Sequence, residues 1–257
     1  MVRNGARHLE EAIQSVLAQD YDCIEYVIVD GGSTDGTLDV IRRHEQDLAW
    51  WVSEPDNGVF DAMNKGIRRT SGSLVKLLNA DDRLTRDSVR RAVELYTSHD
   101  QQPVVISSDI VVIDADGRPL KHMGRTRAAN PVRPLLHPSW YVDRRVYDQY
   151  GLYTEHYRIG ADFEMLLRLH FRGVPFLYTQ EPLAEFRTGG QSNRLLLSSI
   201  VERYQILRQY YPRAFAVRAT VPFAYRGLRQ TLLVRALGEE RFYRLRARVG
   251  PALGLDR

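Results

Sequence analysis

The sequence predicts an α/β fold with a doubly wound, mainly parallel sheet, and two observations carry that prediction. Short apolar runs at residues 24–29 (IEYVIV) and 74–78 (LVKLL) are typical of parallel strands covered on both faces. Between them lie segments with apolar residues at helical spacing or with helix-capping sequences. Strands that alternate with helices favour parallel pairing through crossover helices.

The elements before residue 100 each follow from a local pattern. Residues 8–19 carry apolar side chains on one helical face, and the first strand follows at 24–29. The sequence STDG at 33–36 supplies capping side chains for a helix that ends near residue 44. The alternation then continues with a strand at 49–52, a helix at 59–69, the strand at 74–78 and a helix at 88–96.

The elements after residue 100 are less evenly spaced. A long β-branched run predicts a strand at 104–113, which ends in the turn sequence DADG. Apolar periodicity then predicts helices at 142–150 and 162–171, and short apolar runs predict late strands at 175–178 and 184–186.

Composition is that of a soluble globular protein. The 257 residues are 44% hydrophobic and 26% charged, which excludes disorder and a disulfide scaffold. With a single cysteine, Cys23, the chain forms no internal disulfide, so we expect a reducing compartment. No secretory signal opens the sequence and no apolar run reaches bilayer length. These features predict a cytoplasmic protein.

Acidic side chains follow two of the predicted strands. Asp30 closes the strand at 24–29, and Asn79-Ala80-Asp81-Asp82 closes the strand at 74–78. Ligands bind beyond the carboxyl ends of strands in open parallel sheets, although an aspartate after a strand often only forms a turn or caps a helix. Paired carboxylates such as Asp81 and Asp82 suit Mg²⁺ or Mn²⁺ as ligands. Substrate phosphates commonly complete the coordination shell of these ions.

Four segments together resemble successive motifs of the family 2 glycosyltransferases, most closely the bacterial polysaccharide-assembly branch. They are VDGGSTDGT at 29–37, SEPDNGVFDAMNKGI at 53–67, SGSLVKLLNADD at 71–82 and IGADFEMLLRL at 159–169. The resemblance covers roughly residues 4–192 and keeps the order of the family motifs. One such motif is weak evidence, whereas four in register are strong.

The resemblance implies a GT-A fold and a role for several residues. Asp30 resembles the acid that reads the nucleotide base, and Asp162 matches the catalytic base. Asn79, Asp81 and Asp82 stand at the DxD motif, which implies a Mg²⁺ or Mn²⁺ cofactor with Asp81 as its first candidate ligand. Two departures stand out: Asn79 replaces the usual first Asp of that motif, and Gly31 replaces a common second Asp after the first strand.

Local sequence also indicates, apart from the resemblance, that Asp162 could act as a base. It lies at the start of a helix whose apolar residues Phe163, Leu166, Leu167 and Phe171 are expected to face inward. The helix dipole keeps a carboxylate ionised at that end, as a base requires. A helix cap is the alternative use of such an aspartate.

Four further residues are weaker candidates. Asp61 and Asn64 share a face of the helix at 59–69 and, with Lys65, could line the donor pocket, or that helix could simply be solvated. His137 stands where the family often has a histidine near the acceptor. The sequence GGQS at 189–192 resembles a flexible loop in which glycines act as hinges.

The chain is expected to divide near residue 194. Residues 1–194 would form the catalytic domain, with a nucleotide-binding half to about 113 and an acceptor half from about 114. Residues 195–257, with 12 arginines against four acidic residues, would form a helical appendage. Its interleaved aromatic residues fit either helices packed on the domain or an anionic membrane surface at the inner face of the cell membrane; nucleic acid is disfavoured.

The sequence as a whole predicts an inverting glycosyltransferase of cell-surface polysaccharide synthesis. It would move a sugar from a nucleoside-diphosphate sugar to a hydroxyl acceptor, with a lipid-linked saccharide as one candidate. The alternative is a non-catalytic nucleotide-sugar-binding or scaffold protein on the same fold. Only three residues precede Asn4, so we also expect the first strand of the family sheet to be truncated.

Overall fold

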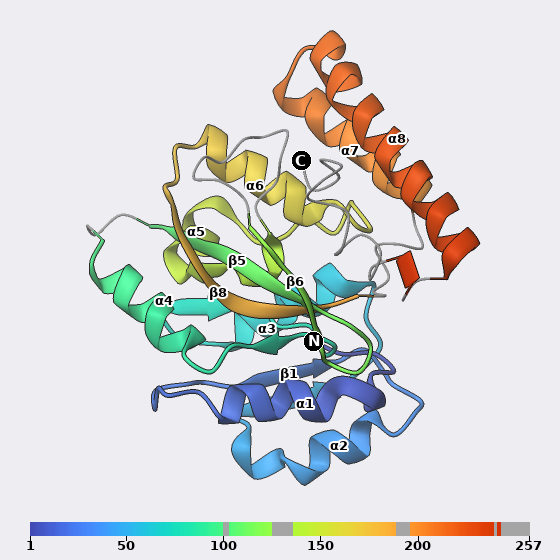
Figure 1. Cartoon of the computed structure of the whole chain (residues 1–257). Coiled ribbons are helices and arrows are strands. Elements are labelled where there is room, and N and C mark those ends of the chain that lie inside the picture. Colours follow the sequence, from blue (N-terminus) through green and yellow to red (C-terminus); the bar gives the residue numbers. More distant parts are fainter. Residues whose placement is uncertain (100–102, 125–135, 189–195, 239–240, 243–257) are drawn as a thin grey trace. The chain divides into compact units, whose positions relative to one another are not determined.

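The computed structural model describes residues 1–99, 103–124, 136–188, 196–238 and 241–242 (Figure 1). They belong to two compact units. The larger unit consists of residues 1–110 and 124–186, and the smaller unit of residues 111–123 and 187–257. The predicted boundary at residue 194 falls outside the described residues, and the predicted division into halves near residue 113 stays a prediction.

The larger unit begins with a parallel pair of strands between helices. The elements in order are α1 (Ala6–Leu17), β1 (Val27–Asp30), α2 (Thr37–Arg43), the 3-10 turn η1 (Glu45–Asp47), β2 (Trp50–Ser53) and α3 (Val59–Arg69). Leu9 and Ile13 of α1 pack with Ile28 of β1 in a buried cluster, whereas α3 packs against β1 from its other face. Both faces of β1 are thus covered, which is why its sequence is continuously apolar.

The second sheet is mixed, so the prediction of a mainly parallel sheet is wrong. Its strands follow the order β3-β7-β5-β8-β4, with β6 beside β5. Pairs β3–β7, β5–β7 and β4–β8 are antiparallel. The strands are β3 (Leu74–Lys76), β4 (Arg83–Leu84), β5 (Val105–Ile113), β6 (Pro119–Met123), β7 (Tyr141–Asp143) and β8 (Phe176–Arg187).

Strands β4 and β7 were not predicted because they are too short to show a period. β4 has two residues and β7 three, too few to show alternation. The predicted helix at 142–150 therefore began too early: Asp143 ends β7 and then caps α5 (Arg144–Tyr150) by accepting the amide of Arg145 at 2.9 Å. The two late strands form one continuous strand, β8.

Helices α4 (Ser88–Thr97) and α6 (Ala161–Phe171) complete the larger unit, with a 3-10 turn, η2 (His137–Ser139), before β7. The inward face predicted for α6 holds for Phe163, Leu166 and Leu167, which are buried. It is wrong for Phe171, which is 49% exposed at the end of the helix.

At the start of the chain a single residue pairs with β1. Val2 forms an isolated parallel bridge with Asp30. Its N–H donates to the Val29 carbonyl at 2.9 Å, and its carbonyl accepts the Gly31 amide at 2.8 Å. Val2 therefore lies on the edge of β1 that faces away from β2.

The smaller unit contains β6, the end of β5 and two helices, α7 (Leu196–Tyr210) and α8 (Arg213–Leu237). Helices α7 and α8 pack together closely. The Arg203 guanidinium lies 4.8 Å from the centre of the Phe223 ring, and a Cβ atom on Gly227 would stand 2.3 Å from Leu196, so glycine permits the approach. Within the described part of the chain, every helix is too short or too polar to cross a membrane.

Candidate functional site

The carboxylate of Asp30 is held at the end of β1 by the protein itself. The side chain is fully buried. One of its oxygens accepts bonds from the amides of Gly32 and Ser33 at 3.1 and 2.9 Å and from the Ser53 hydroxyl at 2.6 Å. The other oxygen accepts the Ser33 hydroxyl. Asp30 thus shapes the loop after β1, and its predicted contact with a nucleotide base stays a prediction.

The loop after β2 is fixed by two of the predicted residues. Asp61 accepts the Asn57 amide at 3.0 Å and pairs with Lys65 at 3.3 Å, and Lys65 also pairs with Glu54 at 2.8 Å. The Asn57 amide, with Lys65 as a further contribution, holds the pKa of Asp61 below its ordinary value. The bond to Glu54 raises the pKa of Lys65. Asp61 and Lys65 therefore clamp the segment from Glu54 to Asn57.

This clamp places Asp56, a residue that the sequence did not single out, beside Gly31. One oxygen of Asp56 accepts the Gly58 amide at 3.0 Å. The other lies 2.0 Å from the position that a Cβ atom on Gly31 would take. A side chain at residue 31 and this carboxylate cannot coexist, so Gly31 makes room for Asp56. The half-buried Asp56 carboxylate thus lies against the backbone of Gly31, directly after β1.

The acids after β3 differ in their surroundings. Asp82 is 2% exposed, and the Asn79 side-chain amide donates to it at 2.9 Å. An aspartate at residue 79 could not make this bond because its carboxylate has no hydrogen to donate. Asp81 is half-buried. Among the described residues no group of three or more His, Cys, Asp or Glu side chains could hold a metal, so substrate oxygens would have to complete any site here.

The Met1 ammonium group connects the two strand ends. Burial lowers its pKa to about 6, against opposing contributions from the carboxylates of Asp30 and Asp81. Both carboxylates therefore lie close to one group, so the ends of β1 and β3 lie near each other although the two strands belong to different sheets.

A second cluster joins α3 to the segment before α6 through Tyr153. The Asn64 side chain, 1% exposed, donates to the Tyr153 carbonyl at 2.8 Å and accepts its amide at 3.0 Å. The Tyr153 hydroxyl lies 2.9 Å from Nε2 of His137. Asn64 is thus engaged in positioning Tyr153, and its predicted contact with the donor stays a prediction. Nothing in the local sequence signals Tyr153.

Asp162 lies in the first turn of α6 and is half-buried. The helix cap is Gly160, and the Asp162 carboxylate accepts the Phe163 amide at 2.7 Å. The Asp162 charge is close enough to Tyr153 to raise the pKa of its hydroxyl, after the larger effects of burial and of Tyr147. Tyr153 therefore hydrogen-bonds to two predicted residues, Asn64 and His137, and feels the charge of a third, Asp162.

Comparison with known proteins identifies the chain. The profile described as "Glycosyl transferase family 2" matches residues 1–166. The chain belongs to glycosyl transferase family 2. The predicted family is confirmed, and the protein is a glycosyltransferase.

The glycosyltransferase is similar over most of its length to mycobacterial relatives. It is 30% identical over 225 residues to an uncharacterised glycosyltransferase of Mycobacterium tuberculosis H37Rv, which covers 81% of this chain and 82% of the relative. It is 27% identical over 206 residues to a PGL/p-HBAD biosynthesis glycosyltransferase of Mycobacterium bovis BCG, which covers 78% and 80%.

Solved structures support the GT-A-like fold. Mannosyltransferase PcManGT of Pyrobaculum calidifontis, in complex with GDP-Man and Mn²⁺, superposes with a TM-score of 0.63 at 20% identity, over 99% of this chain and 78% of that one. Residues 1–349 of TarS from S. aureus, in complex with UDP, give a TM-score of 0.61 at 14% identity, over 89% and 70%. The GGQS segment of this glycosyltransferase at 189–192 lies outside its described residues.

The half-buried His137 should make this glycosyltransferase sensitive to acid. Burial lowers the pKa of His137 to about 3. In the unfolded chain the pKa is about 6.5, so between these values the unfolded state binds more protons and the free energy of unfolding falls as pH drops. His137 alone should remove ~2 kcal/mol between about pH 7 and about pH 5.

Urea denaturation of the wild type and of His137→Gln at both pH values measures this contribution. Glutamine does not titrate, so the variant should lose ~2 kcal/mol less than the wild type between the two conditions. Equal losses in the two proteins would contradict the assignment of the acid sensitivity to His137.

Proposed function

We propose that this glycosyltransferase moves one sugar from a nucleoside-diphosphate sugar to a hydroxyl acceptor, with inversion at the anomeric carbon, in the assembly of a cell-surface polysaccharide or related glycoconjugate. The observation that carries the proposal is the half-buried Asp162 carboxylate in the first turn of α6, in the motif of the family base. The ligands bound in two structural neighbours, UDP and GDP-Man, support a nucleotide-linked donor.

The reaction needs no covalent enzyme intermediate. Asp162 takes the proton of the acceptor hydroxyl while that oxygen forms a bond to the anomeric carbon. The bond from the anomeric carbon to the diphosphate oxygen breaks on the opposite side, and the nucleoside diphosphate leaves with the electron pair. The partial positive charge of the helix N-terminus keeps Asp162 ionised before this step.

The residues after β3 fit a divalent cation. Asp81 and the buried Asp82 supply carboxylate oxygens, the ligand type that Mg²⁺ and Mn²⁺ prefer, and both ions commonly keep open positions for substrate phosphates. Mn²⁺ accompanies GDP-Man in PcManGT, which supports the same class of cofactor here. When bound, the cation would neutralise charge on the departing diphosphate.

The proposal is tested with the full chain and a panel of UDP-, GDP- and dTDP-linked sugars. A thermal shift finds the donor, and release of nucleoside diphosphate is then followed with candidate acceptors, among them lipid-linked saccharides. We expect release that depends on acceptor, and a product with inverted anomeric configuration by NMR. A donor that binds without release in the presence of every acceptor would instead favour the non-catalytic alternative.

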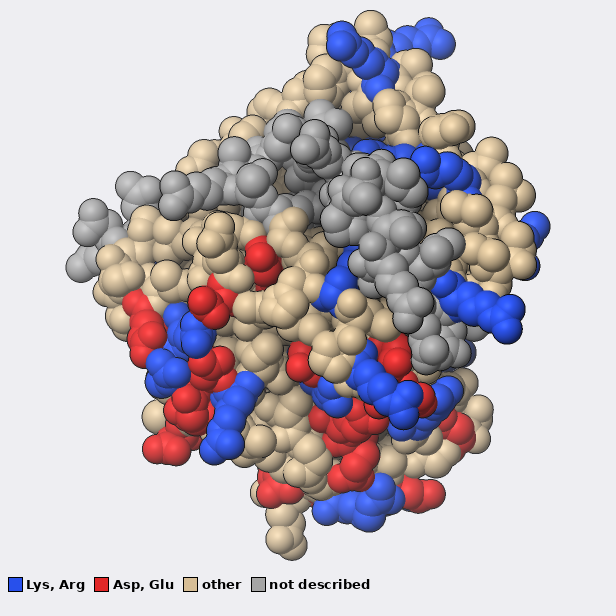
Figure 2. Space-filling model, in the orientation of Figure 1, with Lys and Arg blue, Asp and Glu red and all other residues tan. Residues whose placement is uncertain are grey.

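Helix α8 supports an acceptor that is carried on a membrane. It contains five arginines and no acidic residue. Exposed apolar residues recur along one face at spacings of three or four, namely Val217, Val221, Tyr225, Leu228 and Leu232. In Figure 2 the surface over α7 and α8 carries blue side chains among tan ones, and no red side chain shows there. An apolar stripe flanked by arginines suits the interface of an anionic bilayer.

We therefore expect the chain to sediment with phosphatidylglycerol vesicles and not with neutral phosphatidylcholine vesicles. The double variant Arg226→Glu and Arg229→Glu should bind the anionic vesicles about tenfold more weakly or worse, since each basic residue near the surface contributes ~1 kcal/mol. Both side chains are exposed. Arg42→Glu with Arg118→Glu changes the net charge equally at other exposed sites and serves as the control. Equal losses in both variants would exclude α8 as the contact.

A further inference from the structure

The acid at the end of β1 is closed to a ligand. Asp30 is fully buried, and one of its oxygens accepts the amides of Gly32 and Ser33 and the hydroxyl of Ser53. The other oxygen accepts the Ser33 hydroxyl. A ligand could reach this carboxylate only if it displaced the groups that hold the loop. A carboxylate that is open to a ligand at this end of the sheet therefore has to come from another segment.

Asp56 brings such a carboxylate to the backbone that follows β1. Strands β1 and β2 are parallel, with Asp30 opposite Ser53, so the loops after both strands leave the same edge of the sheet. The Asp56 side chain is half-buried, and its Oδ2 occupies the space that a Cβ atom on Gly31 would take. Among the described residues, the Gly58 amide is the one hydrogen-bond donor to this carboxylate, and it binds Oδ1 at 3.0 Å. Oδ2 thus keeps its lone pairs for a ligand.

A cation lies against the same glycine. The Cδ atom of Arg3 is 3.4 Å from the place of a Cβ atom on Gly31, and the Arg3 side chain is exposed. The next residue, Asn4, fixes this segment because its amide donates to the Ser33 hydroxyl at 2.7 Å. The bare backbone of Gly31 therefore has an acceptor, Asp56, and a donor, Arg3, beside it.

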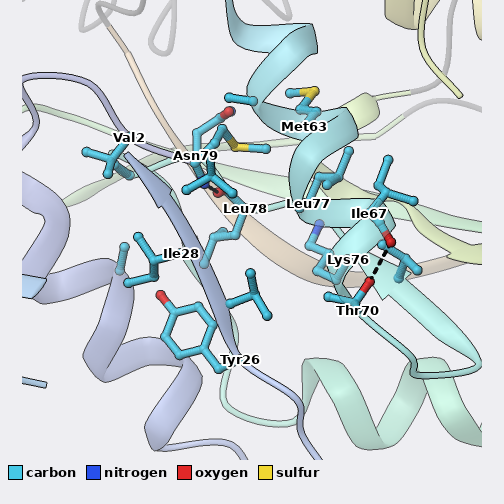
Figure 3. A pocket seen from close by; sticks show the side chains of 18 of the residues that line it. Val2, Tyr26, Ile28, Met63, Ile67, Thr70, Lys76, Leu77, Leu78 and Asn79 are labelled. Carbon is cyan, nitrogen blue, oxygen red and sulfur yellow. Dashed lines mark hydrogen bonds between the residues drawn. The ribbon is translucent and has the colours of Figure 1, made fainter. Parts of the chain in front are cut away.

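This acceptor and donor lie near the residues proposed to hold the cation. Val2, whose carbonyl accepts the Gly31 amide at 2.8 Å, and Asn79, which precedes Asp81 and Asp82, line one cavity (Figure 3). Ligands of α/β sheets bind beyond the carboxyl ends of the strands, where both groups lie. With the diphosphate at Asp81, the nucleoside can extend over Gly31.

Asp56 and Arg3 match one class of nucleobase. Guanine, uracil and thymine carry a ring N–H beside a carbonyl on the edge that pairs with another base, whereas cytosine and adenine have a bare ring nitrogen there. A carboxylate only accepts hydrogen bonds and a guanidinium only donates them. A ring N–H with its neighbouring carbonyl complements this pair, but a bare ring nitrogen would meet the Asp56 carboxylate without a hydrogen between them.

We propose that Asp56 recognises the base of the donor nucleotide. Its carboxylate accepts the ring N–H of guanine, uracil or thymine, and Arg3 donates to the neighbouring carbonyl. The assignment rests on the proposed function, a nucleotide-linked donor, and gives the base contact to Asp56 in place of the fully buried Asp30. Gly31 takes part by lacking a side chain, because a Cβ atom would displace the Asp56 carboxylate.

Calorimetry of the full-length protein with nucleoside diphosphates tests this contact. We expect UDP, GDP or dTDP to bind at least about tenfold more tightly than CDP and ADP, since a hydrogen bond to a charged group contributes about that factor. A methyl group on the ring nitrogen, as in 3-methyluridine or 1-methylguanosine diphosphate, removes the donor. It should weaken binding to the wild type by a similar factor of about ten.

Asp56→Asn isolates the role of the carboxylate. Asparagine keeps an oxygen for the Gly58 amide and turns its NH2 group toward the base. The variant should bind the preferred nucleotide about tenfold more weakly, should lose the methyl penalty, and should bind CDP more tightly than the wild type does. Gly31→Ala, in which the Cβ atom displaces the carboxylate, should lose the methyl penalty as well. Asp148→Asn changes an exposed carboxylate of α5 and should bind every nucleotide as the wild type does.

The same titrations contain the results that would overturn the proposal. These are the absence of a methyl penalty in the wild type and an equal penalty in the wild type and Asp56→Asn. A third is loss of the preference for ribose over 2′-deoxyribose in Asp56→Asn, because the carboxylate would then bind the ribose. All three leave the proposed donor class intact. If no nucleotide binds at all, the proposed function itself is wrong, and the base contact with it.

Discussion

The Asp162→Asn variant is expected to lose transfer almost completely while it binds the donor as the wild type does. A general base contributes about 10²- to 10⁴-fold to a rate, so we expect kcat to fall by about 10³-fold. Asparagine keeps the size of the side chain and accepts the Phe163 amide as aspartate does, so the first turn of α6 should stay intact. Single-turnover rates and donor titration by calorimetry measure the two quantities separately.

Asp148→Asn is the matched control for this substitution. Asp148 is an exposed carboxylate of α5 in the same unit, so its variant should transfer at the wild-type rate. Near-normal turnover by Asp162→Asn would remove Asp162 from the mechanism. A parallel loss of donor affinity would point to a binding role for the carboxylate instead.

The Asp81→Ala variant should bind the nucleotide-sugar donor about tenfold to hundredfold more weakly in the presence of Mn²⁺, a change of about 1.4–2.7 kcal/mol. The reason is the loss of the half-buried carboxylate, which leaves the buried Asp82 as the remaining acidic ligand. Calorimetry of the wild type and the variant, each with Mn²⁺ and with a chelator, checks this expectation.

The chelator serves as the control for this measurement. If Asp81 acts through the cation, the chelator should weaken donor binding in the wild type and should weaken it far less in the variant. Asp82→Asn, which can still accept the Asn79 amide, should lose less affinity than Asp81→Ala. Equal donor affinity of the wild type with and without chelator would make the metal assignment wrong.

Local sequence determined the elements that carry the strand-end acids. The apolar runs before Asp30 and before Asn79 form β1 and β3, and the helix predicted at 59–69 is α3 with the same bounds. These elements are readable because a strand covered on both faces and an amphipathic helix each impose a period on neighbouring residues. The family motifs likewise occupy continuous segments, which is why the family could be identified from them.

Tertiary structure alone decided the order and direction of the strands in the second sheet and which side chains contact one another. β7 has three residues and adopts its conformation because β3 and β5 pair with it, so its own sequence shows no period. The bond from Asn64 to Tyr153 joins residues 89 positions apart. Asp56 stands beside Gly31 because Asp61 and Lys65 hold its loop there. Such contacts depend on the distances between elements. The hydrophobic period of a sequence indicates only which face of each element is buried, so it cannot predict them.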